Sequence, residues 1–229
     1  MQNPQYILML PVLLFSLSFH EFAHALAAWW AGDDTAARMG RLTMNPISHI
    51  DPIGTIVVPA ICLFQSMAGG GGFFFGWAKP VPVNPGRFRK TIWDVYVSFA
   101  GPASNFILVV IFAVIVKILY KTEILYSSRF SREVQDMIYQ LAFSFISLNA
   151  LLGLFNLLPI PPLDGSHIFY HFLVRPHSRD HVLFKIFEIM ERYGFILLMA
   201  LIFAVPVEIN PFYLIFNLSM RIVTWFIIL

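Results

Sequence analysis

Apolar stretches of about 20 residues limit what this chain can fold into more than any other feature. The first runs through about residues 6–31 and ends at Gly32-Asp33-Asp34. About 20 apolar helical residues cross the hydrocarbon core of a bilayer, where only helices and closed barrels satisfy every backbone polar group. Only 12% of the 229 residues are charged, about half the fraction usual in soluble domains. We therefore expect a membrane protein.

The expected fold is an all-α polytopic membrane domain. Its N-terminus lacks the positive charge of a signal peptide, and the first apolar run is too long for one, so we expect a retained helix. Residues 1–229 should form a single domain, with a core at about 6–173 and two further helices at about 193–229. The five segments that could span are about residues 6–31, 94–119, 137–158, 193–207 and 211–229.

Residues 53–83 suggest a re-entrant hairpin. Ile53–Met67 is apolar, but its 15 or so residues are fewer than a span usually needs. Four glycines follow at 69–72, and then a second, aromatic arm. Such a backbone survives at membrane depth only where protein buries it or where it lines a wet cavity. The alternative is an ordinary short span followed by a loop.

The first apolar stretch contains His20-Glu21-Phe22-Ala23-His24. Residues four apart lie on one face of a helix, so both imidazoles can bind a single Zn²⁺. Glu21 lies beside them, where a general base would take a proton from water at the metal. The alternative, a polar face bonded to a neighbouring helix, is costly because ionisable residues within a span generally serve a function. The motif predicts His20 and His24 as metal ligands and Glu21 as a catalytic residue.

A catalytic zinc site needs a third protein ligand and one open position. Cys62, the chain's single cysteine, lies in an apolar run and fits a packing role better. Asp164 is the stronger candidate, because it lies deep in an apolar stretch after prolines that break the helix. Alternatively, Asp164 caps the helix that restarts after those prolines.

Four segments together resemble the site-2 protease family of intramembrane zinc metalloproteases. His20-Glu21-Phe22-Ala23-His24 lies in an early span, and Asn156…Pro159…Leu163-Asp164-Gly165 follows later, as in that family. Gly101-Pro102-Ala103-Ser104-Asn105 is similar to the family's middle core helix. Residues 75–85 are similar to a segment of its compact bacterial and archaeal members. The resemblance covers about residues 15–170 in the expected order, without PDZ-like or CBS-like modules.

The resemblance implies cleavage of a peptide bond within the transmembrane helix of another membrane protein. It implies one Zn²⁺ per chain, with Asp164 as the third ligand. It also implies that Asn156 contacts the substrate or an oxyanion, and that the active site is buried in the bilayer.

A shared metal would place the three ligands at one depth in the membrane. His20 and His24 lie towards the C-terminal end of the first span, and Asp164 lies late in its own helix. These depths agree only if both helices run in the same direction, so residues 53–83 should make no net crossing.

Charge counting favours the same topology. With the N-terminus outside, ten lysines and arginines lie inside and four outside, which follows the positive-inside rule. The site would then lie towards the cytoplasmic side of a cell membrane. The inner residues are Arg38, Arg41, Lys79, Arg87, Arg89, Lys90, Arg175, Arg179, Lys185 and Arg192, and the outer ones are Lys117, Lys121, Arg129 and Arg132.

Two other functions remain open. A metal or proton transporter could use the same buried ligands, although repeated halves or paired broken helices, typical of transporters, are not visible. A catalytically inactive membrane chaperone or scaffold is the other, and the intact set of His20, Glu21 and His24 argues against it. The net charge of +2 does not suggest a nucleic-acid partner. The expected partners are the lipid bilayer and transmembrane substrates, and the sequence does not indicate an oligomeric state.

Overall fold

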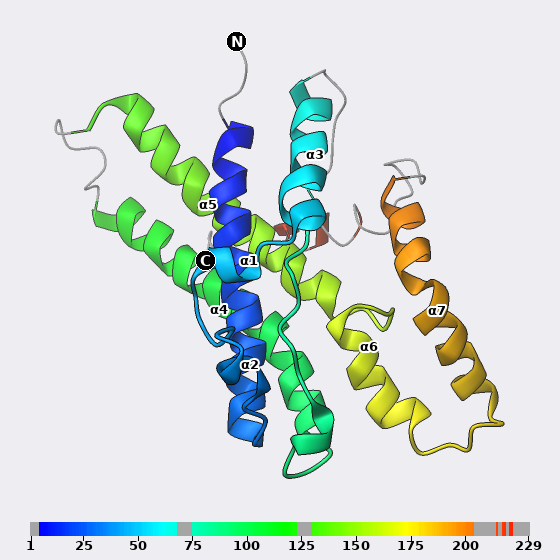
Figure 1. Ribbon diagram of the computed structural model, residues 1–229. Coiled ribbons are helices and arrows are strands. Elements are labelled where there is room, and N and C mark those ends of the chain that lie inside the picture. Colours follow the sequence, from blue (N-terminus) through cyan, green and yellow to red (C-terminus); the bar gives the residue numbers. More distant parts are fainter. Residues whose placement is uncertain are drawn as a thin grey trace.

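The computed structural model describes residues 5–67, 75–122 and 130–203, together with the single positions 214, 217, 218, 220 and 221. Over these ranges the chain is helical and contains no strand (Figure 1). The elements are α1 (Gln5–Ala31), α2 (Thr35–Arg38), the 3-10 helix η1 (Pro46–His49), the π-helix η2 (Pro52–Val57), α3 (Val58–Met67), the 3-10 helix η3 (Pro85–Arg87), α4 (Trp93–Thr122), α5 (Arg132–Asn156), α6 (Asp164–Phe169), the π-helix η5 (Tyr170–Val174) and α7 (Val182–Phe203).

Three helices in the described part are long and apolar enough to cross a membrane: α1 over Leu8–Ala31, α4 and α5. Only 22% of the apolar window of α4 is buried, so most of its residues are at least partly exposed, as expected of a helix that faces lipid. Trp29 and Trp30, both about half exposed, lie at the C-terminal end of α1, where the aromatic belt of a spanning helix is expected. The three helices confirm the expected all-helical membrane fold, and the full number of spans stays a prediction.

The helix directions agree with the depth argument. In Figure 1 the chain descends through α1, rises through α4 and descends again through α5 into α6. The helix that carries His20 and His24 therefore runs in the same direction as the one that leads to Asp164. α1 ends at Ala31, and the next residue, Gly32, has a φ of +108° that is unfavourable for other residues. At this turn the Asp33 N–H donates to the Ala28 carbonyl at 2.9 Å, a typical helix C-cap.

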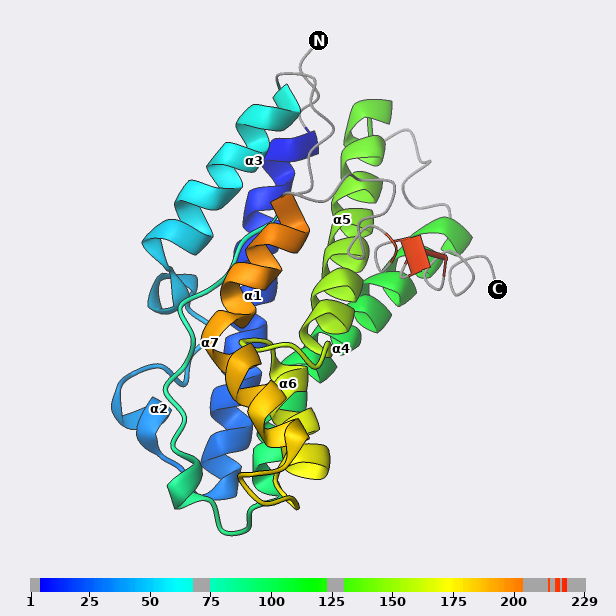
Figure 2. The same cartoon turned by 90° about the vertical axis from the view of Figure 1, so that its right-hand side faces the viewer.

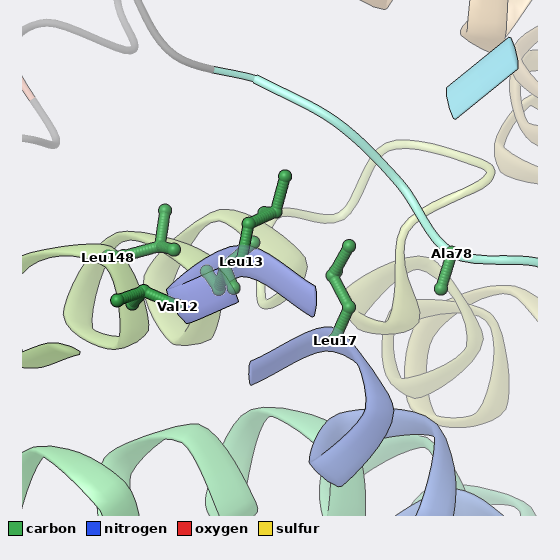
Figure 3. Close-up of a cluster of buried hydrophobic side chains, with 6 residues drawn as sticks. Val12, Leu13, Leu17, Ala78 and Leu148 are labelled. Atoms are coloured by element: carbon green, nitrogen blue, oxygen red, sulfur yellow. The ribbon is translucent and has the colours of Figure 1, made fainter. Parts of the chain in front are cut away.

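The core lies where α1, α4 and α5 pack together. Ala113 of α4 packs with Ile146 and Ala150 of α5. Small residues at such contacts let helix backbones approach closely, which drives helix association in lipid. A second cluster joins α1 to α5 and to the extended segment 75–84 (Figure 3). It consists of Val12, Leu13, Leu17, Ala78, Leu148 and Leu152.

Residues 53–83 form two arms of different structure. η2 and α3 rise towards the end of the molecule where α1 begins, and an extended arm from residue 75 descends again (Figures 1 and 2). The expected glycine turn at 69–72 lies outside the described residues. Asp51 begins η2 by accepting hydrogen bonds from the N–H groups of Ile53 and Gly54. The return to the same side agrees with no net crossing, while insertion of these arms into the bilayer stays a prediction.

Residues 193–203 of the expected fourth span lie in α7, which begins earlier, at Val182. Lys185, Glu188 and Arg192 are exposed on the surface of α7, while Phe187 is buried. Residues 204–207 and almost all of 211–229, the expected fifth span, lie outside the described residues.

Asp33 holds the end of the extended arm against the C-terminal end of α1. Its buried carboxylate accepts hydrogen bonds from the Asn84 N–H at 2.6 Å and from the N–H and hydroxyl of Thr35. Burial alone would raise the pKa of Asp33, but these donors hold it below its ordinary value. The arm is thus anchored just beyond the membrane end of α1.

Replacing Asp33 with asparagine should destabilise this anchor. Hydrogen bonds to a charged group contribute about 1.5–3 kcal/mol each, and asparagine presents one acceptor and one donor to a site built of donors. Because the folded-state pKa is lowered, the stability from Asp33 is present above its unfolded pKa of about 3.9 and is lost as the pH falls through the lower folded value. Thermal melts in detergent at neutral and acidic pH should show a deficit for Asp33→Asn that shrinks in acid. A constant deficit would contradict the assignment.

Candidate metal centre

His20 and His24 lie one helical turn apart on α1 and point the same ring edge into the protein. Their Nε2 atoms are 3.0 Å apart, and their rings are nearly perpendicular. Both residues are less than 10% exposed. The i, i+4 spacing that suggested a shared metal therefore gives two ring nitrogens directed at one point.

Asp164 is the first residue of α6 and completes the cluster. Its Oδ2 lies 3.2 Å from His20 Nε2, and its Oδ1 lies 3.3 Å from His24 Nε2. Leu163 occupies the N-cap position of α6, without a side-chain capping hydrogen bond, so Asp164 is not the cap residue that the alternative predicted. Within the described residues, one group of at least three histidine, cysteine, aspartate or glutamate side chains could hold a metal ion. It is formed by His20, His24 and Asp164, whose ligand atoms all lie within 4.8 Å of one another.

The donor set fits zinc in spacing. Two ligands of a tetrahedral zinc with bonds of 2.0–2.1 Å lie about 3.3 Å apart. The three separations of 3.0, 3.2 and 3.3 Å are close to that edge length.

The hydrogen bonds behind the rings also fit a metal. His24 Nδ1 lies 2.7 Å from the Val97 carbonyl, and His20 Nδ1 lies 2.7 Å from Asn105 Oδ1. A carbonyl can only accept, so His24 Nδ1 donates, and the Nε2 of its neutral ring is a bare lone pair. Asp164 Oδ2 is buried and has no hydrogen-bond partner. The lone pairs of His24 Nε2 and of the Asp164 carboxylate thus face one another across the centre. A cation bound between them would satisfy both.

Gly101 of α4 forms one wall of the centre. A Cβ at this position would lie 2.3 Å from His24 Nε2 and 2.6 Å from His20 Nε2. Any side chain would therefore occupy the space that the ring nitrogens face. Gly101, Val97 and Asn105 all lie on α4, so the middle helix both closes the centre and holds the two rings from behind.

Glu21 lies beside the ligands and is fixed by the extended arm. Its Oε2 accepts a hydrogen bond from the Val81 N–H at 2.7 Å, and the residue is 9% exposed. Pro80 and Pro82 flank Val81 and have no N–H, so Val81 supplies the donor in this stretch. The carboxylate is therefore held in one orientation next to the histidines.

A cavity of about 370 Å³ connects these groups. Asn156, at the C-terminal end of α5, lies on its wall and donates Nδ2 to the Leu152 carbonyl at 3.0 Å. The exposed His167 also lines the cavity. α7 forms a further side, where the Phe195 ring meets the Trp77 ring edge-on at 5.8 Å. In Figure 2, α7 lies in front of α1.

The structure gathers every predicted site residue around one cavity, while their chemical roles stay predictions. Cys62 lies elsewhere, with its Sγ 4.0 Å from the Phe75 carbonyl. Sequence reasoning missed Gly101, Val97 and Val81. The last two act through backbone atoms, for which the sequence carries no signal, whereas Gly101 lies in a segment whose resemblance was noted without a role.

The chain matches the model of peptidase family M50 over residues 8–201. It is 43% identical over 192 residues to YwhC of Bacillus subtilis, which is named a zinc metalloprotease, covering 82% of this chain and 77% of the relative. Rip2 of Mycolicibacterium smegmatis, also named a zinc metalloprotease, is 31% identical over 161 residues, or 70% of this chain and 55% of the relative. Rip2 of Mycobacterium tuberculosis is 26% identical over 181 residues, or 76% and 58%. No solved structure matches the chain significantly.

Proposed function

The chain belongs to peptidase family M50, the site-2 protease family, and on that premise we propose that it hydrolyses peptide bonds within the transmembrane segments of other membrane proteins. Its relatives are named zinc metalloproteases, and zinc is the metal of the family. The convergence of His20, His24 and Asp164 beside Glu21 carries the proposal.

Zinc held by His20, His24 and Asp164 would supply the Lewis acidity that activates water and polarises a peptide carbonyl. Glu21 takes the proton from the attacking water and returns it to the nitrogen of the leaving peptide. The hydrogen bond from Val81 keeps one oxygen of that carboxylate fixed during both transfers. Asn156 lines the same cavity, and its amide can donate to the substrate carbonyl after turning from Leu152.

The lining of the cavity supports an apolar, unwound substrate. Phe75, Phe155, Leu163 and Leu198 surround the polar centre, which suits the side chains of a transmembrane segment. A helical substrate has its carbonyls in hydrogen bonds, so it must unwind locally before attack. The extended arm runs along the cavity, with Gly76, Ala78 and Val83 in its lining, and an unwound segment could pair with its backbone.

The membrane setting of the site follows from the three spanning helices. His20 and His24 lie within the span of α1, so water must reach them through the cavity. Together with the excess of lysine and arginine on the side where α1 ends, this supports a site towards the cytoplasmic face. We propose that residues 1–229 form a single membrane domain. The transporter alternative is not favoured, because the matched family and the named relatives are proteases.

Cleavage in reconstituted membranes tests the function. Purified protein in liposomes with a labelled single-span substrate should release fragments whose new termini lie within the span. A chelator should stop the reaction by removing the ion from His20, His24 and Asp164. Added Zn²⁺ should restore the reaction, because these side chains can bind the ion again. The termini can be read by mass spectrometry. Metal uptake into the liposomes without any cleavage of a panel of spans would support the transporter and overturn the proposal.

A further inference from the structure

Three fully buried polar side chains meet behind the metal centre, one from each long helix. Ser16 of α1, Asn105 of α4 and Asn149 of α5 are each 0% exposed. Polar residues between membrane helices are generally bonded across the interface, since lipid offers them no partner. These three form a chain of hydrogen bonds that ends on a predicted metal ligand.

The distances define one continuous chain of hydrogen bonds from Ser16 to His20, which we call the relay. Asn149 Nδ2 donates to the Phe145 carbonyl and to Ser16 Oγ, both at 2.8 Å. Asn105 Nδ2 donates to Asn149 Oδ1 at 2.8 Å. Asn105 Oδ1 then lies 2.7 Å from His20 Nδ1. All three helices that carry the fold thus contribute to the environment of one imidazole.

The hydrogen bond from Asn149 to the Phe145 carbonyl fixes the donor and the acceptor of every other bond in this chain. The Phe145 carbonyl can only accept, so the amide nitrogen of Asn149 must face it. Asn149 then presents its oxygen to Asn105, which turns the amide nitrogen of Asn105 towards Asn149 and its oxygen towards His20. An acceptor at this position requires His20 Nδ1 to donate, which leaves Nε2 as a bare lone pair directed at the centre. A backbone carbonyl of α5 therefore decides the tautomer of a histidine on α1.

We propose that Asn105 and Asn149 are positioning residues that hold His20 in its Nδ1–H tautomer and so preset Nε2 to bind the metal. His24 needs no such relay, because the Val97 carbonyl binds its Nδ1 directly. The inference rests on the metal site of the proposed function. Outer partners of ligating histidines fix the ring orientation and tautomer, and their loss lowers metal affinity by about 10- to 100-fold.

Zinc affinity, measured by competition with a chromogenic chelator in detergent, tests the relay without any substrate. Asn105→Leu should weaken zinc binding by about 10- to 100-fold. Asn105→Asp should bind zinc within a few-fold of wild type, because its carboxylate still accepts from His20 Nδ1. Asn149→Leu frees Asn105 to flip and should weaken binding by about tenfold. Ser147→Ala is the matched control, since Ser147 is a buried polar residue on α5 that bonds its own helix at Phe143, and its zinc affinity should be unchanged.

A tautomer measurement separates positioning from a general packing role. In zinc-free wild type at alkaline pH, histidine ¹⁵N shifts should show His20 protonated at Nδ1, and Asn149→Leu should give a mixture. Wild-type affinity in both leucine variants, or an Asn105→Asp variant that melts like wild type but binds zinc as weakly as Asn105→Leu, would overturn the inference. If Asn105→Leu does not fold, Asn149→Leu and Asn105→Asp decide it. If wild type itself binds no zinc, the metal site of the proposed function fails instead.

Discussion

Glu21→Gln should abolish cleavage while leaving one zinc bound per chain. Glutamine has nearly the same shape and keeps an oxygen that can accept the hydrogen bond from Val81, so the cavity should be unchanged. It cannot take a proton from water, and general-base catalysis contributes about 10²- to 10⁴-fold. The three predicted ligands are untouched, so zinc content should not fall.

Two measurements on the same preparation check this result: the rate of fragment release in liposomes, and zinc per chain by elemental analysis. Glu188→Gln is the matched control, because Glu188 is exposed on α7 and does not line the cavity. That variant should cleave at the wild-type rate. A Glu21→Gln protein that cleaves as fast as wild type would show that Glu21 is not the base.

Gly101→Ala should weaken zinc binding, although residue 101 supplies no ligand. The added Cβ would lie 2.3 Å from His24 Nε2 and 2.6 Å from His20 Nε2, so the rings or α4 must move. Movement of α4 would break the hydrogen bonds that the two rings donate to the Val97 carbonyl and Asn105 Oδ1. Overpacking costs about 1–3 kcal/mol. Here the strain would displace the two histidine ligands, so it would make the free energy of zinc binding less favourable. We therefore expect zinc affinity to drop by up to about 100-fold.

A glycine elsewhere in the helix packing provides the control. Gly153 of α5 is also in close contact, but an added Cβ would meet the far end of the Phe106 ring at 2.9 Å, and that side chain can turn away. Gly153→Ala should keep its zinc and lose some thermal stability. Chelator competition and melting curves on both variants distinguish the two cases. Wild-type zinc affinity in Gly101→Ala would mean that α4 does not bound the metal centre as described.

Local patterns predicted the parts of this protein that depend on local physics. The length and apolar character of α1, α4 and α5 follow from the bilayer thickness, and their expected positions are confirmed. The i, i+4 spacing of His20 and His24 already placed two ring nitrogens on one helix face. α7 begins at Val182, well before the span expected from residue 193, because bilayer thickness sets the length of a span and not where the helix that carries it begins. Nor did the apolar character of residues 53–83 show that the first arm would be helical and the second extended.

The sequence by itself determined that the chain is a helical membrane protein with a metal-binding motif inside its first span. The reason is that span length and helical periodicity are properties of neighbouring residues. Only the tertiary structure decided what surrounds that motif. Asp164 reaches the histidines because α1 and α5 descend in the same direction. Val81 fixes Glu21 through a backbone N–H, and α4 brings Gly101 and Asn105 against the rings. These contacts join residues far apart in the chain, often through backbone atoms that every residue shares, so no local pattern could encode them.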